Sequence, residues 1–349
     1  MEASVGKNHV FYIGILVGAI FLWLALRDAP TAELAYAFGS ANLLWIAPFL
    51  LALFGFYWLK ALRWRILLTP LIVTETRTVF PPVMVGYSAN VVLPAQLGEI
   101  VRVIVGARAL GLGYSETLAT VVLERIFDFL TVLLVLGLAL LLGAETSATM
   151  LHAGYLVTGL TVALTGGVLV FARWTERCIV FTRFFTRHLR TALERKLLDS
   201  LRRGAVGLQA LNHSDLLLQT LLISVAQWAC MLLCVWISLA ALGITAPFAA
   251  ALLVLALTVV GVSLPTSPGY VGTIQFAYTL ALAQYEIASA TALAASVFYH
   301  ALAYFSVFFV GLYYLHRMGY TLGQVKAEAE AAHYSEPAAT TQSTQNEQS

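Results

Sequence analysis

Residues 86–130 read GYSANVVLPAQLGEIVRVIVGARALGLGYSETLATVVLERIFDFL and place ionisable side chains within apolar sequence. Glu99 and Arg102 fall within one apolar segment, and Glu124, Arg125 and Asp128 open the next. Ionisable groups inside membrane segments are unfavourable, so they usually face a bundle interior or a watery cavity and mark the pathway of a polar substrate. This stretch is therefore the first candidate for a functional site.

The same stretch carries residues that interrupt a helix. Pro94 and Gly98 lie close to Glu99. A proline removes a backbone donor and breaks a helix, and a bilayer tolerates such a break only where protein or a cavity satisfies the freed groups. The pattern predicts a broken, re-entrant element that carries the polar groups, with Asn90 supplying a further hydrogen bond to the cavity.

The overall composition supports a membrane setting. Of 349 residues, 60% are hydrophobic and 11% are charged, and the mean hydropathy is +0.83. These values predict a polytopic membrane protein instead of a soluble globule. The three cysteines form neither a disulfide framework nor a zinc spacing, and the sequence has no nucleotide, metal or nucleophile motif. We expect no cofactor, no metal, no nucleic acid partner and no enzymatic activity.

Hydropathy predicts the number of membrane helices. A span needs about 20 predominantly apolar residues, and the segments that meet this are 10–26, 43–62, 117–142, 151–172, 216–242 and 288–315. Two further apolar regions, 79–113 and 247–284, are interrupted by proline and glycine. We therefore expect an all-α polytopic membrane protein with six full transmembrane helices and two discontinuous re-entrant helical elements. Whether the two halves are inverted repeats stays open, because no clear internal identity supports it.

The basic residues predict the topology. Lysines and arginines, Lys60 and Arg63 among them, cluster in 60–78 and 173–213, which places these segments in the cytoplasm. With both termini inside, the two broken regions must enter the membrane from opposite faces. Paired discontinuous segments are typical of a transporter site near the bilayer midplane.

The chain divides into a membrane domain and a tail. Residues 1–318 are expected to form one membrane-embedded domain, in which 173–213 makes basic amphipathic helices at the cytoplasmic surface. Residues 319–349 are rich in polar residues and alanine and are predicted to be a disordered cytoplasmic tail.

The charges of the central stretch have helical spacings. Glu99 and Arg102, three residues apart, share a helix face and can pair. Glu124 and Asp128, four apart, share another face, from which Arg125 points about 100° away. If these segments pack together, they form a polar cavity for an anionic or zwitterionic headgroup, with Arg102 or Arg125 on the phosphate. In the alternative, Glu124, Arg125 and Asp128 merely lie at the cytoplasmic interface, where charged side chains reach water.

A second constellation is SLPTSPGYVGTIQ, residues 263–275. Its prolines and glycines predict a tight turn within the bilayer and a new helix whose free N–H groups attract phosphate. Ser267, Gly269 and Gln275 are the candidate ligand-binding residues here. Helix capping by Thr266 or Ser267 is the competing structural interpretation.

These motifs together resemble those of a known family. The residues are Asn90, Pro94, Gly98-Glu99, Arg102, Glu124-Arg125, Asp128, Pro265 to Gly269, and Gly272. In this order they resemble the transmembrane region of lysylphosphatidylglycerol synthases and its stand-alone relatives, over residues 5–318. Tyr270 and Gln275 stand where relatives often have Gly and Glu. The resemblance implies movement of lipid between leaflets. Because no aminoacyltransferase domain follows residue 318, transfer of lysine to lipid is not expected.

The expected function is thus a lipid flippase or transporter of the cell inner membrane that moves a phospholipid or related polar lipid. The alternatives are a membrane-embedded enzyme that uses Glu99 or Asp128 as general acid or base, and an accessory subunit of a lipid-modifying enzyme. The expected partners are membrane lipids. Whether the protein also forms a homo-oligomer or associates with a lipid-synthesising enzyme stays open. The predicted headgroup-binding residues are Asn90, Glu99, Arg102, Glu124, Arg125, Asp128, Ser267, Gly269 and Gln275.

Overall fold

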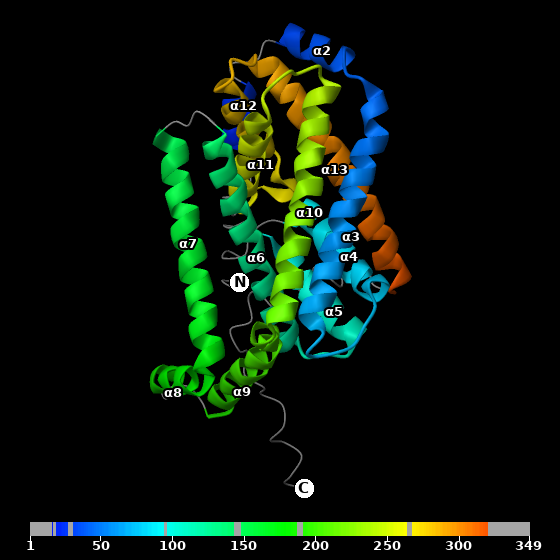
Figure 1. Ribbon diagram of the computed structural model, residues 1–349. Helices are drawn as coiled ribbons and strands as arrows, with labels where there is room; N and C mark the ends of the chain where they lie inside the picture. The colour runs from blue at the N-terminus through cyan, green and yellow to red at the C-terminus, as the bar shows by residue number, and fades with distance from the viewer. Residues whose placement is uncertain are drawn as a thin grey trace, which may run out of the picture.

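The computed structural model describes residues 16, 19–26, 31–93, 96–142, 148–186, 191–263 and 267–319. Within these residues all regular secondary structure is helical, as the all-α prediction requires. The elements are α2 (Thr31–Gly39), η2 (Leu43–Trp45), α3 (Ile46–Leu68), α4 (Thr76–Val92), α5 (Leu97–Leu110), α6 (Tyr114–Leu141), α7 (Ala148–Arg173), α8 (Thr175–Thr186), α9 (Thr191–Gly207), η3 (Gln209–Asn212), α10 (Ser214–Ala241), α11 (Phe248–Ser263), η4 (Pro268–Tyr270), α12 (Thr273–Ala283) and α13 (Ser289–Arg317). Figure 1 shows the long helices running side by side along one axis.

Three of the described segments are long and apolar enough to cross a membrane, namely Leu43–Leu68, Ser214–Ala241 and Ser289–Arg317. They coincide with three of the predicted spans. Helices α6 and α7 coincide with two others, at 117–142 and 151–172. Of the first predicted span, 10–26, residues 10–15, 17 and 18 lie outside the described residues, as does nearly all of the predicted tail, from residue 320 on.

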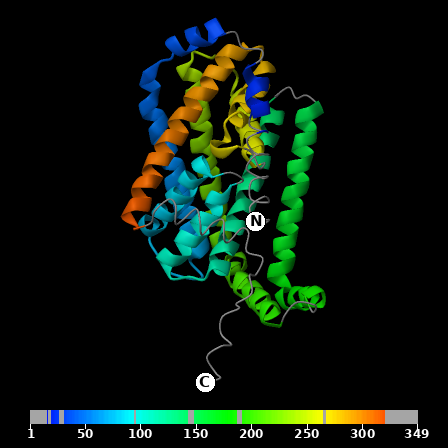
Figure 2. The same cartoon turned by 180° about the vertical axis from the view of Figure 1, so that it is seen from behind.

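The two interrupted regions fold as pairs of shorter helices. Helices α4 and α5 join at residues 93–96, and α11 joins α12 through η4. Pro94, Pro265 and Thr266 lie outside the described residues. Figure 1 shows α4 and α5 in the half of the bundle that also holds α9, and α11 and α12 in the opposite half. The view from behind agrees (Figure 2).

The two breaks meet in the middle of the bundle. Gln96, which lies in the first break with a left-handed backbone (φ 58°), donates a hydrogen bond of 2.7 Å from Nε2 to the carbonyl of Val262 at the end of α11. Gly269 in η4 also has a positive φ, of 65°, and a Cβ there would lie 3.3 Å from the Val91 carbonyl oxygen. The described backbone of each break is therefore in contact with the other break.

The basic segment 173–213 is helical, as predicted, and forms α8 and α9 at one end of the bundle (Figure 1). Helix α9 packs closely on α6 at Gly207. Because glycine has no side chain, its backbone approaches the Glu116 carbonyl more closely than a residue with a Cβ could. This contact fixes the basic helices against the helix that carries Glu124 and Asp128.

Helix α13 holds α4 in place through a close backbone approach. A Cβ at Gly311 would overlap the Ser88 side chain and come within 2.6 Å of the Met84 carbonyl oxygen. Ser88 Oγ also donates to the Phe308 carbonyl at 3.3 Å. Small residues allow such approaches between membrane helices.

We therefore expect Gly311→Ala to lower the free energy of unfolding by about 1–3 kcal/mol, as overpacking does in a tight interface. The matched control is Gly137→Ala, because no atom lies within 4 Å of the position of its Cβ. In that open helical position alanine is neutral or slightly stabilising. Unfolding of both purified variants in detergent checks this, and equal stability of the two variants would contradict the close packing of α13 on α4.

Candidate functional site

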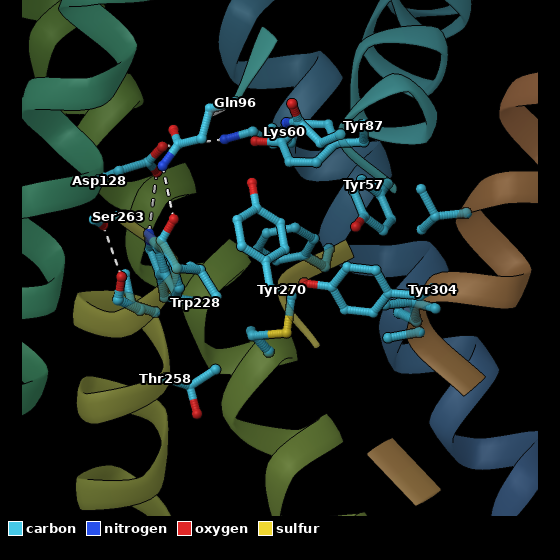
Figure 3. Close-up of a pocket in the computed structure, with 18 of the residues that line it drawn as sticks. Tyr57, Lys60, Tyr87, Gln96, Asp128, Trp228, Thr258, Ser263, Tyr270 and Tyr304 are labelled. Atoms are coloured by element: carbon cyan, nitrogen blue, oxygen red, sulfur yellow. Dashed lines mark hydrogen bonds and ion pairs between the residues drawn. The ribbon is translucent and has the colours of Figure 1, made fainter. Parts of the chain in front are cut away.

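A cavity of about 170 Å³ lies where the two helix breaks meet. Its walls come from α3, α4, α5, α6, α10, α11, α13 and η4. Figure 3 shows Lys60, Gln96 and Asp128 along one side of the space, Tyr57 and Tyr304 along the other, and Tyr270 between them. The polar side chains of the wall include those of Lys60, Asn90, Gln96, Glu99, Arg125 and Asp128. The cavity thus brings charge into an otherwise apolar bundle.

Behind the cavity, two cations of α3 face two carboxylates of α6. Lys60 Nζ lies 2.7 Å from Glu124 Oε1 and 3.1 Å from Asp128 Oδ2. Arg63 Nη2 lies 2.7 Å from Asp128 Oδ1 and 3.1 Å from Glu124 Oε1. The four-residue spacing of the two acids places both on the face that meets α3.

Helix α5 adds two more ion pairs with α6. Arg102 donates to both oxygens of Glu124, at 3.1 and 2.6 Å, and its guanidinium lies 4.1 Å from the centre of the Trp64 ring. Glu99 pairs with Arg125, and Arg125 also donates to the Tyr87 hydroxyl at 3.3 Å. Glu99 and Arg102, which the spacing predicts to pair, are 3.7 Å apart. Their shorter contacts are with α6.

These ion pairs are deeply buried. Arg63, Arg102 and Glu124 are 0% exposed and Asp128 is 5% exposed. Charges are tolerated in such surroundings only when they are paired and hydrogen-bonded. Helix α10 adds two hydrogen bonds to this network, the first to Ser224 Oγ, which accepts from Arg63 Nη1 at 2.9 Å. Trp228 Nε1 in the same helix donates to Asp128 Oδ1 at 3.2 Å.

The structure brings together all five charged residues that the sequence singles out between 99 and 128. Glu124 and Asp128 are buried among other helices, so their side chains do not extend into bulk water as the interfacial alternative assumes. Their places relative to the cavity differ. Glu99, Arg125 and Asp128 line it, whereas Arg102 is enclosed between Glu124 and Trp64. Arg102 therefore positions Glu124, and of the two predicted phosphate-binding arginines only Arg125 reaches the cavity.

Asn90 lines the cavity and also stabilises the first break. Its Oδ1 accepts a hydrogen bond of 2.8 Å from the Gly98 N–H, across the break from α4 to α5. Gly98 is required there, because a Cβ would overlap the Gly86 carbonyl oxygen and the Asn90 side chain. The sequence therefore has Asn and Gly at these positions for a structural reason in addition to any contact with a ligand.

The candidates of the second break shape the backbone around η4. Ser267 Oγ donates to the Val271 carbonyl at 2.8 Å, so the predicted capping of α12 by Ser267 is wrong. The cap comes from Gln275, whose Oε1 accepts from the Gly272 N–H at 2.8 Å. Gln275 Nε2 lies 2.9 Å from His300 Nδ1. None of Ser267, Gly269 and Gln275 lines the cavity.

Gly269 and Gln275 instead line a neighbouring groove of about 540 Å³. Its wall is mostly apolar and includes Val92, Phe305 and Phe308, and it shares Val91 and Tyr304 with the cavity. Val92 is 47% exposed and Phe305 is 63% exposed. The groove is thus an apolar surface that continues directly from the wall of the polar cavity.

Lys60 and Arg63 are the two residues of the ion-pair network that sequence reasoning did not place there. The prediction that placed them in a cytoplasmic loop is wrong, since α3 continues to Leu68 and both side chains are buried against α6. Hydropathy ends the predicted span at residue 62, because charged residues lower the average even when they face inward. Their spacing was the usable signal, since Lys60, Arg63 and Trp64 recur at i, i+3 and i+4 on one helix face.

A helical bundle with a buried ion-pair network beside a cavity at two helix breaks defines this chain as a multi-pass membrane protein. The model of the family described as "Lysylphosphatidylglycerol synthase TM region" matches residues 11–311, so the chain belongs to that family. This confirms the resemblance and links the protein to lipid metabolism or transport. No curated protein and no solved structure gives a significant match.

We expect Glu124→Gln to destabilise the bundle strongly, because it removes the partner shared by Lys60, Arg63 and Arg102. Breaking a buried ion pair in this way costs about 3–5 kcal/mol, and unfolding of the purified protein in detergent measures it. The control is Glu176→Gln in α8, whose carboxylate is 73% exposed and should leave unfolding unchanged. An unchanged midpoint for Glu124→Gln would show that the network does not hold α3, α5 and α6 together.

Proposed function

We propose that this protein is a lipid flippase or transporter that moves a phospholipid or related polar lipid between membrane leaflets. The observation that carries this proposal is the cavity between the two helix breaks, which presents Lys60, Glu99, Arg125 and Asp128 inside an apolar bundle. A polar headgroup crosses hydrocarbon at a high free-energy cost. Charged partners at the centre of the bundle lower that cost.

The proposed topology has six full spans, made by residues 10–26 and by α3, α6, α7, α10 and α13. The pairs α4–α5 and α11–α12 then act as re-entrant elements that enter from opposite faces. Their placement in opposite halves of the bundle (Figures 1 and 2) supports this arrangement. Discontinuous helices that meet near the midplane are the usual site of substrate in transporters.

The chemistry of the cavity wall suits a lipid headgroup. The Arg125 side chain is 30% exposed and the Glu99 side chain 17% exposed, although the two form an ion pair. An exchangeable pair of this kind offers a guanidinium to a phosphate and a carboxylate to a headgroup cation. We propose that a bound headgroup competes for these groups, so that the pair opens when substrate enters and closes when it leaves.

The apolar groove gives the acyl chains a place outside the polar cavity. The groove and the cavity share Val91 and Tyr304, and the rings of Tyr304 and Tyr270 lie 6.0 Å apart at this boundary. A lipid whose headgroup occupies the cavity can extend its chains along the exposed apolar surface toward the membrane. This supports transport of an intact lipid, in which only the polar part enters the protein.

We further propose that the protein lies in the cell inner membrane with both termini in the cytoplasm. The basic helices α8 and α9 support this orientation, because arginine-rich segments next to spans stay on the cytoplasmic side. Their positive charge also favours contact with anionic headgroups of that leaflet.

Transbilayer movement of fluorescent phospholipids in liposomes tests the proposal. We expect fast movement with the full-length protein and a rate at least about tenfold lower with Glu99→Gln, which corresponds to a barrier about 1.4 kcal/mol higher. The substitution leaves Arg125 without its carboxylate and alters the charge that a headgroup meets. The control is Glu176→Gln, which makes the same chemical change on exposed α8 and should move lipid at the full rate.

Wild-type protein that inserts normally and moves no lipid would reject the transporter, and Glu99→Gln at the full rate would reject this path. Mass spectrometry of lipids extracted from the same liposomes separates transport from the enzymatic alternative. A new covalent lipid species that forms only with the protein would favour an enzyme that uses Glu99 or Asp128 as acid or base.

A further inference from the structure

The buried network contains more positive than negative charge. The described residues that its ion pairs connect are four cations and three carboxylates: Lys60, Arg63, Arg102 and Arg125 with Glu99, Glu124 and Asp128. With every group ionised, the formal sum is 4 − 3 = +1. A surplus charge is unusual in a buried site, because low-dielectric surroundings strongly disfavour a charge without its own counterion.

When each arginine is assigned one carboxylate, Lys60 is the remaining cation, and of the two cations of α3 it is the one that lines the cavity. Each arginine has a carboxylate of its own, since Arg102 takes both oxygens of Glu124, Arg63 lies 2.7 Å from Asp128 and Arg125 pairs with Glu99. Lys60 contacts only carboxylates that already have an arginine partner, Glu124 and Asp128. Of the four cations that contact Glu124 or Asp128, Lys60 and Arg125 line the cavity, and Arg125 has its closer partner in Glu99.

Lys60 has the capacity to hold another ligand. An ammonium group has three N–H donors, and the contacts with Glu124 and Asp128 account for two of them. The ammonium group also lies over the aromatic ring of Tyr87, with Nζ 5.4 Å from the ring centre. Figure 3 shows Lys60 and Tyr87 together at the edge of the cavity, with Tyr57 and Tyr270 nearby. Their hydroxyl groups offer hydrogen bonds to an anion that reaches Lys60.

We propose that Lys60 is the anion-binding residue of the cavity and that the site takes a singly charged phosphate-type group, which brings the network to neutrality. A lipid phosphodiester carries this charge, and inorganic phosphate offers the same chemistry from solution. The lipid as the source of the anion rests on the proposed function. The site itself follows from the charge count and the position of Lys60.

Thermal unfolding of the full-length protein in detergent tests the site without any transport measurement. We expect dioleoyl phosphatidylglycerol to raise the unfolding temperature, because ligands that bind only the folded state stabilise it. Dioleoylglycerol has the same chains without the phosphate and should raise it much less. Inorganic phosphate is the third ligand in the series. Its effect, compared with that of the phospholipid, shows whether the anion comes from a lipid or from solution.

Substitution of Lys60 gives a second, independent signature. In Lys60→Met three cations face three carboxylates, so the lipid-free variant should unfold at or above the wild-type temperature. Its apparent dissociation constant for phosphatidylglycerol should nevertheless rise at least about tenfold, equivalent to 1.4 kcal/mol. A lysine with only a structural role would instead lose stability when replaced. The control Arg203→Met removes the same charge from exposed α9 and should change neither quantity.

Equal stabilisation of the wild type by dioleoylglycerol and phosphatidylglycerol would overturn the proposal, whether or not Lys60→Met folds. So would wild-type affinity of the folded Lys60→Met protein for phosphatidylglycerol. Lys60-dependent binding without transbilayer movement would reject the transporter and keep the anion site. Full transport by Lys60→Met would reject the anion site and keep the transporter.

Discussion

The requirement that buried charges be paired determines how this bundle is arranged. Glu124 lies within 3.1 Å of Lys60, Arg63 and Arg102, which come from α3 and α5. Arg63 and Arg102 are 0% exposed, so neither can exchange the carboxylate for water. Helices α3 and α5 must therefore pack on α6 in one register, because a shift of one turn would leave charges unpaired in apolar surroundings. The first helix break lies directly before α5, so the packing of α5 on α6 also positions this break in the middle of the bundle, where Gln96 contacts α11.

The second constraint is the backbone of the two breaks. Each break interrupts a helix and frees backbone hydrogen-bonding groups, and in the described residues a side chain binds one of these groups at each break. Asn90 accepts from Gly98 across the first break, and Gln275 accepts from Gly272 in the second. Gln96 then joins the two by its bond to Val262. The cavity lies at this junction, so the same contacts that close the backbone also define the space available to a ligand.

Much of this arrangement can be predicted from the sequence, because charged and helix-breaking residues within apolar segments indicate either a buried polar site or an interrupted helix. The spacing of Glu124 and Asp128 predicts a shared face, and the prolines and glycines predict both breaks. The pairing of Arg102 with Glu124 instead of Glu99 was not predictable, since tertiary packing decides between two carboxylates within reach. Lys60 and Arg63 were misplaced because hydropathy averages over a helix and does not register which face a charge occupies. The capping of α12 was not predictable either, because serine and threonine are the usual capping residues, whereas here the Gln275 side chain accepts from the Gly272 N–H.

The surplus positive charge of the network indicates that the site binds a ligand in addition to holding the helices together. A balanced set of ion pairs would hold α3, α5 and α6 together equally well, and replacing a buried charge by an apolar group often increases stability. Retaining Lys60 beside two carboxylates that already have arginine partners therefore has no clear benefit for folding alone. Lys60 benefits binding instead. An anion that enters the cavity can pair with its ammonium group, because Glu124 and Asp128, which contact the ammonium, are also paired with arginines. Release is favoured for the same reason, since Glu124 and Asp128 stay within 3.1 Å of the ammonium and recover their share of it when the anion leaves.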